Sequence, residues 1–168
     1  MQEPAHPNSH RHGSLAERIA IAPGALQWAR GSAPGVRRMV LDTADGADGR
    51  LTAFMRFAPG ARCVEHEHAG GEEILVLAGA LADERGVHRA GTYFRNGPGS
   101  RHAPASPGGC TIFLKLRQFA PGDVGSSLVD TTRMRWSRGR SPQTSIMPLH
   151  AFGGERTRLV HWRAGIGG

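Results

Sequence analysis

Apolar residues along the chain come in short runs between polar residues and turn signals, rather than in long helical stripes. Between about residues 26 and 119, these runs predict strands at 36–41, 51–57, 62–68, 73–77, 91–94 and 111–116. Clusters of Gly, Pro and Asp separate them, such as Ala-Pro-Gly at 58–60, Asp-Glu-Arg-Gly at 83–86 and Asn-Gly-Pro-Gly at 96–99. Strands this short and this close together predict an all-β barrel or sandwich.

Two further segments flank this region: a leader, residues 1–25, and a C-terminal extension, residues 120–168. In the leader, Ser14 followed by Glu17 has the form of a capping box and predicts a short peripheral helix. The leader also holds His6, His10 and His12, a group that can chelate a metal ion but to which we assign no function.

The extension has little apolar periodicity between residues 124 and 147, which predicts an irregular excursion around the barrel. Its end shows a faint internal repeat. A shift of 105 residues lays Gly154 on Gly49 and Trp162 on Phe57. The extension is therefore either irregular or a truncated repeat that copies the strand at 51–57.

Composition excludes several classes of protein. At 168 residues the chain fits one domain with a real core. The net charge of +7 comes from arginines spread along the chain without a dense basic run, so we expect no nucleic-acid partner. Cys63 and Cys110 lack the spacing of a disulfide framework or a redox pair. No secretory or membrane-spanning run is present, so we expect a cytoplasmic protein with no membrane partner.

The chemistry concentrates in the segment from Gly60 to Gly79. His66 and His68 are two residues apart on a predicted strand, so their imidazoles share one face. The Ala-Gly-Gly turn at 69–71 then returns the chain beside them, which brings a glutamate to the pair. Because neighbouring strand residues face opposite sides, either Glu72 or Glu73 points inward, but not both.

A second segment, residues 91–102, offers one more donor. There a tight Pro-Gly turn precedes His102 at the head of a strand. Three imidazoles and a carboxylate form a mixed nitrogen and oxygen set that suits iron(II), manganese, nickel, copper or zinc and suits calcium poorly. The sequence therefore predicts one divalent metal ion, with the choice among Fe, Zn, Mn and Ni open.

These motifs resemble those of the cupin superfamily. Its first motif runs Gly, five residues, His-x-His, three or four residues, Glu, six residues, Gly, and it fits Gly60, His66, His68, Glu72 and Gly79. The gap to Gly79 selects Glu72 over Glu73. The second motif matches at Gly91, Pro98, Gly99 and His102, with one extra residue before Pro98 and a shortened Pro-Gly turn. The resemblance implies a single cupin barrel, a jelly-roll or double-stranded β-helix, over residues 26–119 with metal ligands His66, His68, Glu72 and His102.

Within the superfamily, the stretches Gly-Gly-Glu-Glu-Ile-Leu-Val-Leu and Ala-Gly-Thr-Tyr-Phe-Arg-Asn resemble the ChrR-type cupin group. That group includes the cupin domain of a zinc-binding anti-sigma factor and is similar to diketone-cleaving dioxygenases. The resemblance implies a small-molecule dioxygenase with a non-haem metal or, alternatively, a zinc-binding sensor module without catalysis. We leave open whether the chain is an enzyme, and expect a small-molecule ligand and a homodimer.

For other side chains in the predicted barrel, the sequence allows both a structural and a functional role. Tyr93, Phe94 and Phe113 either line the pocket or, as is commoner, belong to the core. Cys110 is interpreted as a buried apolar thiol rather than a redox-sensitive group near the metal. Arg95 and Arg101 either steer an anionic ligand at the barrel mouth or are solvated.

Overall fold

The structure, a computed structural model, describes residues 20–22, 24–44 and 49–165. Almost all regular structure in these residues is β, which confirms the predicted all-β class; the one helix there is a single 3-10 turn, η1 (Thr131–Arg133). The strands are β1 (Ala29–Arg30), β2 (Val36–Thr43), β3 (Leu51–Phe57), β4 (Ala61–Arg62), β5 (His66–His68), β6 (Glu72–Asp83), β7 (Gly86–Arg89), β8 (Thr92–Asn96), β9 (Ser100–His102), β10 (Ala105–Ser106), β11 (Cys110–Leu116), β12 (Ser127–Asp130), β13 (Ser137–Arg138), β14 (Thr144–Phe152) and β15 (Glu155–Trp162).

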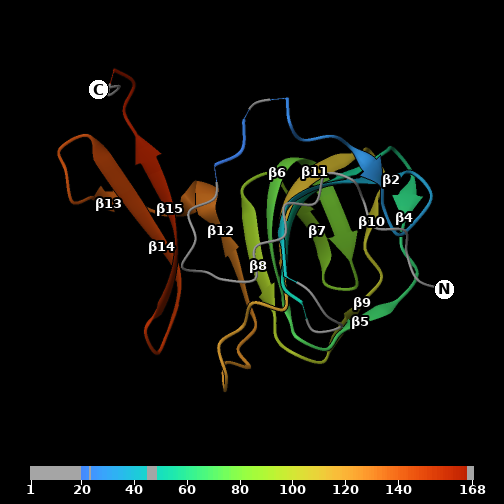
Figure 1. The fold of residues 1–168 in the computed structure, drawn as a ribbon. Helices are drawn as coiled ribbons and strands as arrows, with labels where there is room; N and C mark the ends of the chain where they lie inside the picture. The colour runs from blue at the N-terminus through green and yellow to red at the C-terminus, as the bar shows by residue number, and fades with distance from the viewer. Residues whose placement is uncertain (1–19, 23, 45–48, 166–168) are drawn as a thin grey trace.

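Ten strands form one curled antiparallel sheet, in the order β1-β2-β3-β11-β6-β10-β4, with β7 and β8 also paired to β6 and β12 paired to β8 (Figure 1). Apolar side chains from the inner face of this sheet fill the core. The core residues are Val36, Phe57, Ala61, Ile74, Val76, Leu81, Phe94, Cys110, Ile112 and Leu114. Cys110 and Phe94 thus belong to the core, as expected.

The pairing of β6 with β8 determines what each face of the sheet presents. Glu72 is opposite Asn96, and the next pair is Glu73 opposite Arg95. Because neighbouring residues of a strand face opposite sides, the first pair points into the barrel and the second points away from it. Two adjacent residues on each strand therefore serve two different sites.

The segments that flank the barrel differ from what the sequence predicts. The short helix expected from Ser14 falls almost entirely on residues 1–19, outside the described part of the chain, and the structure does not bear it out. The prediction of an irregular extension is wrong, because β13, β14 and β15 form a three-stranded antiparallel sheet beside the barrel (Figure 1). No helix in the described residues is long and apolar enough to cross a membrane.

This C-terminal sheet, residues 137–162, has the same pairing as the barrel's opening unit, β1 to β3. Ala29 is opposite Arg38 in the first unit, and Ser137 is opposite Ile146 in the second, at the same offset on both strands. Each unit also has one register shift, between Val40 and Asp42 in β2 and between Pro148 and His150 in β14. The first pairs of the two hairpins are Val36 with Phe57 and Thr144 with Trp162. In each hairpin the shift falls at the fifth residue after the first pair, so both hairpins bend at the same place.

The turns that open the two units also match. Gly31 N donates to Val36 O at 2.9 Å, and Gly139 N donates to Thr144 O at 2.9 Å. The sequences entering these turns are Trp-Ala-Arg-Gly at 28–31 and Trp-Ser-Arg-Gly at 136–139. We propose that residues 136–163 repeat this opening unit; the match of Gly154 with Gly49 and of Trp162 with Phe57 covers its last strand.

A buried ionic cluster lies between the barrel and the C-terminal sheet. Arg95 has no exposed surface; its Nε donates to Glu73 Oε1 at 2.8 Å, and its Nη2 lies 3.0 Å from Asp123 Oδ2. His150 of β14 joins the cluster, with its Nε2 2.8 Å from the same Asp123 oxygen. The prediction that Arg95 steers a ligand or is solvated is therefore wrong, because the register turns it outward into this contact.

Candidate metal centre

Three imidazoles meet at one end of the barrel. β5 and β9 form a two-stranded antiparallel ribbon in which His66 is opposite His102. His68, two residues along β5, shares their face. One nitrogen from each ring lies within 4.8 Å of the others, and His68 Nε2 lies 3.0 Å from His102 Nε2. Three nitrogens this close together from two separate segments form a group that can hold a metal ion.

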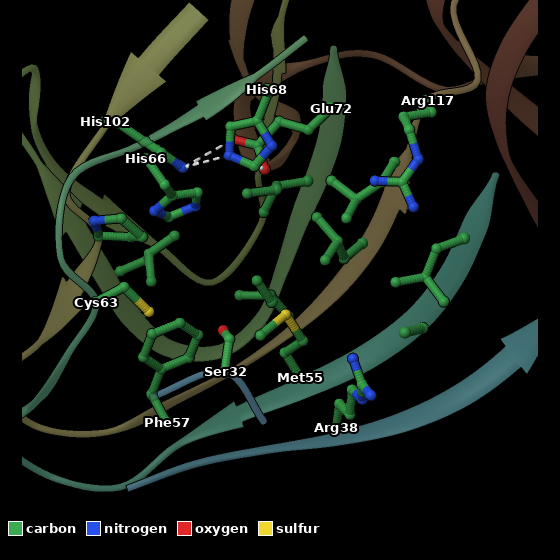
Figure 2. Close-up of a pocket in the computed structure, with 18 of the residues that line it drawn as sticks. Ser32, Arg38, Met55, Phe57, Cys63, His66, His68, Glu72, His102 and Arg117 are labelled. Atoms are coloured by element: carbon green, nitrogen blue, oxygen red, sulfur yellow. Dashed lines mark hydrogen bonds and ion pairs between the residues drawn. The ribbon is translucent and has the colours of Figure 1, made fainter. Parts of the chain in front are cut away.

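The Glu72 carboxylate lies against two of these rings. Its Oε1 is 3.1 Å from His102 Nε2 and its Oε2 is 3.3 Å from His68 Nε2, and the residue is only 2% exposed. Glu73 faces the other way, toward Arg95. The structure therefore places His66, His68, Glu72 and His102 together, and it places Glu73 apart from them (Figure 2).

Neighbouring groups orient two of these four side chains, His66 and Glu72. His66 Nδ1 lies 2.9 Å from the Val64 carbonyl oxygen, so Nδ1 carries the proton and Nε2 is left as the donor nitrogen. The Asn96 amide donates to Glu72 Oε1 at 2.6 Å. His102 Nδ1 is buried without a hydrogen-bond partner, 3.8 Å from Asp83 Oδ2. Such partners behind the ligands are typical of metal sites, where they set the orientation of each donor.

Burial controls the ionisation of the cluster. Desolvation, with the nearby charge of His102, lowers the pKa of His68 to about 3. Desolvation, with the charge of His66, lowers the pKa of His102 to about 4. Both rings are therefore neutral at neutral pH, the form in which histidine binds metal ions. Burial also raises the pKa of the Glu72 carboxyl to about 7, so a free carboxylate is costly there without a cation.

The donor set fits a divalent metal ion. Three neutral nitrogens and one carboxylate oxygen are the ligands that zinc and non-haem iron take in proteins. The buried carboxylate with its raised pKa is a feature that a bound cation would explain. His66, His68, Glu72 and His102 would hold the ion.

The four side chains line one end of a cavity of about 270 Å³. Much of the remaining lining is apolar, and it comes from the inner faces of β3, β6 and β11: Leu51, Ala53, Met55, Phe57, Ile74, Leu81, Ile112, Leu114 and Leu116. Cys63, Arg38 and Arg117 also reach it (Figure 2). Tyr93, Phe94 and Phe113 do not line this cavity, and Arg101 is exposed beside Glu67.

Sequence analysis missed the groups behind the ligands. Asn96 and Asp83 lie in segments that it interpreted only as turns, and Arg85, which donates to Asn96 Oδ1 at 2.5 Å, was treated in the same way. The one available signal was polar residues at strand ends beside a predicted site. Their roles depend on the register of β6 with β7 and β8, which no local pattern determines.

The antiparallel barrel, with a His-x-His strand facing a third histidine, defines this chain as a cupin. The sequence profile of a family described as the ChrR cupin-like domain matches residues 16–120, well over half of the chain. The chain therefore belongs to the ChrR cupin-like family. The comparison with curated proteins returned no match.

Solved structures agree on the fold. An RmlC-like cupin from Ralstonia eutropha JMP134 superposes with a TM-score of 0.53 at 16% identity, covering 60% of this chain and 68% of that one. An acetylacetone dioxygenase from Acinetobacter johnsonii gives 0.51 at 15% identity, covering 71% and 88%. The complex of SigE with the anti-sigma ChrR from Rhodobacter sphaeroides matches only in part, with a TM-score of 0.46 at 26% identity over 54% of this chain and 48% of that one, a match too partial to bear on the fold.

One variant tests whether Asn96 orients the Glu72 carboxylate for metal binding. Replacing Asn96 with alanine removes the hydrogen bond to Glu72 Oε1, so the carboxylate loses its fixed orientation. We expect zinc affinity, measured by competition with a chromophoric chelator, to fall about 10–100-fold. Gln143→Ala, which removes an exposed amide in the turn before β14, is the matched control and should bind like wild type. Equal affinity in Asn96→Ala would show that Asn96 does not orient a ligand.

Proposed function

We propose that the chain is a metal-dependent enzyme of the dioxygenase type that acts on a small molecule in the barrel cavity. The observation that carries this proposal is the placement of the three imidazoles and Glu72 at one end of an apolar cavity, rather than at the surface. A site built for storage or structure needs no adjoining space, whereas a reaction needs room for a substrate beside the ligands.

The chain's own residues then have separable roles. His66, His68, Glu72 and His102 hold the ion, which supplies Lewis-acid activation and, if it is iron(II), the chemistry of dioxygen. Apolar side chains such as Met55, Ile112 and Leu114 exclude water from the substrate. Asn96 and the Val64 carbonyl keep the donor atoms in place as substrate enters and product leaves.

The proposal is tested by metal analysis followed by oxygen uptake. Protein purified without added metal is expected to contain about one ion per chain. The iron(II) form is expected to consume oxygen with at least one of a panel of small β-diketones, the substrate class named for the Acinetobacter dioxygenase. His66→Ala and His68→Ala should lose both metal and uptake. His161→Ala changes an exposed histidine on β15 and should lose neither. Metal-replete protein that is inactive with the whole panel would overturn the enzymatic proposal.

A second candidate is a zinc-binding sensor, the alternative implied by the ChrR-type resemblance. One observation favours it: the four side chains together offer four donor groups, the number that zinc takes when a site has no open position. Tetrahedral zinc in the purified protein, with no oxygen uptake by the iron form, would support this candidate. The homodimer and the cytoplasmic location stay predictions; sedimentation and cell fractionation test them.

A further inference from the structure

The cavity contains two cationic side chains that the proposed metal site does not use. Arg38 of β2 and Arg117, just after β11, both line it, together with the metal ligands and the apolar side chains of the barrel (Figure 2). Figure 2 shows both guanidinium groups on the side of the cavity away from His66 and His102, with aliphatic side chains between. The cavity therefore has a metal-binding end, an apolar middle and a basic end.

The backbone at Arg117 is unusual. Its φ of +55° makes it the one non-glycine residue in the left-handed region among the residues that the structure describes. An ordinary side chain in this region costs free energy, so the surrounding structure must hold it there, and such positions cluster at functional sites. Here Arg117 N donates to Gly71 O at 3.0 Å, and Arg117 Nε donates to Gly49 O at 2.6 Å.

Neighbouring residues leave space for this conformation. A Cβ atom added at Gly70 would lie 2.7 Å from Arg117 Cγ, so only glycine lets the arginine stem lie across this turn. Because Nε is held by Gly49 O, the rest of the guanidinium is directed toward the cavity with little freedom left to lose on binding. This is the arrangement expected for an arginine that binds a ligand rather than one that is merely solvated.

The charges around the cavity favour an anion. Its acidic lining residues are Glu72, which belongs to the metal site, and Glu67, which pairs with Arg101. A divalent ion beside Glu72 would leave that end of the cavity with one net positive charge, and Arg117 adds another at the other end. A low-dielectric cavity with an excess of one sign of charge concentrates ligands of the other sign.

We propose that the ligand of this cavity is a small molecule with an apolar body and a carboxylate group, and that Arg117, assisted by Arg38, binds the carboxylate. The guanidinium group suits this role because it can donate two parallel hydrogen bonds to one carboxylate. The inference deepens the proposed function, on which it rests for the orientation of the other end of the ligand toward the metal. At about 270 Å³ the cavity fits a ligand smaller than a drug-sized molecule.

The test compares two matched probes. Succinylacetone carries a β-diketone at one end and a carboxylate at the other, and heptanedione with its ketones at carbons two and four has a methyl group in place of the carboxylate. Titration calorimetry with the zinc-loaded full chain measures both dissociation constants without requiring turnover. We expect the carboxylate probe to bind about tenfold or more tightly, because a hydrogen-bonded charge pair in a dry site contributes at least that much.

Variants then assign the preference to residues. Arg117→Gln should reduce the preference about tenfold, to near unity, and Arg38→Gln should reduce it by a smaller factor, with melting curves confirming that each variant folds. Arg133→Gln, whose side chain is 87% exposed on η1, should keep the full preference. Equal affinity of the two probes for wild type, or an unchanged preference in Arg117→Gln, would overturn the inference.

The same titrations separate this inference from the proposed function. Zinc-loaded protein that binds both probes equally retains its metal site and loses only the carboxylate inference. Protein that binds no metal but still prefers the carboxylate probe retains the inference and loses the metal site. Both titrations are therefore run with and without zinc.

Discussion

Replacing Arg95 with alanine is expected to lower the free energy of unfolding by about 3–5 kcal/mol, the usual cost of removing one partner from a buried ion pair. The Arg95 side chain has no exposed surface and is the one cation within 4 Å of both Glu73 and Asp123 in the described part of the chain. Its guanidinium also lies 3.9 Å from the centre of the Phe119 ring. Its removal therefore leaves two buried carboxylates that have lost their shared cation, with His150 still beside Asp123 and Lys115 3.9 Å from Glu73.

The Asp123 carboxyl shows how strongly the cluster is coupled. Burial opposes its ionisation, yet hydrogen bonds with Arg95 and His150 hold its pKa below the usual range. A carboxyl whose pKa is lowered in the folded state stabilises the fold above its unfolded pKa and loses that contribution as the pH falls through the folded value. The cost of Arg95→Ala should accordingly be largest at neutral pH and smaller in acid, where the carboxylates are protonated.

Urea denaturation at neutral pH measures the effect. If Arg95→Ala fails to fold, Asp123→Asn, which keeps the shape and removes one charge, gives a smaller loss in the same direction. Arg133→Ala is the control, because an exposed ion pair such as that of Arg133 with Asp130 contributes at most about 1 kcal/mol. A change for Arg95→Ala no larger than for Arg133→Ala would contradict the account of the cluster.

Metal binding is expected to change the free energy of unfolding by a similar amount, in the stabilising direction. A ligand that binds only the folded state stabilises it by mass action, by about 4 kcal/mol when free metal is 1,000-fold above its dissociation constant. Zinc added to protein stripped with a chelator should therefore raise the melting temperature. The ligands come from two segments, β5 to β6 and β9, that meet only in the folded barrel, so an unfolded chain offers no equivalent site.

The His102→Ala variant decides whether this stabilisation belongs to the proposed site. Its melting temperature should not respond to zinc, whereas that of His161→Ala should rise as in wild type. If zinc stabilises His102→Ala as much as wild type, the ion binds elsewhere.

Local rules were enough to find the side chains that meet in the barrel. The two-residue period of a strand places His66 and His68 on one face, and the same period allows only one of Glu72 and Glu73 to join them. The family spacing selected Glu72, and in the structure Glu72 lies with the histidines while Glu73 pairs with Arg95. His102, which is 34 residues from His68, stood out as a histidine after a Pro-Gly turn at the head of a strand, but its approach to the pair depends on long-range pairing that only the resemblance implied.

The remaining features depend on contacts between distant segments. Arg95 is one residue from Asn96, yet it faces the opposite side of the sheet and pairs with residues as far along the chain as His150. No pattern around residue 95 encodes that partner. The C-terminal sheet was predicted only as one of two alternatives, because its strands mix Ser, Thr, Arg and Pro with apolar residues and so give a weak apolar alternation.

The most direct test of the metal centre is the X-ray absorption spectrum of zinc-loaded protein, recorded for wild type and for two multiple variants. One variant changes the leader histidines, His6, His10 and His12, to glutamine; the other changes His66 and His68. We expect one zinc per chain with three nitrogen donors and at least one carboxylate oxygen, an identical spectrum in the leader variant, and no bound zinc in the other. A spectrum lost with the leader histidines and kept without His66 and His68 would show that the barrel holds no metal.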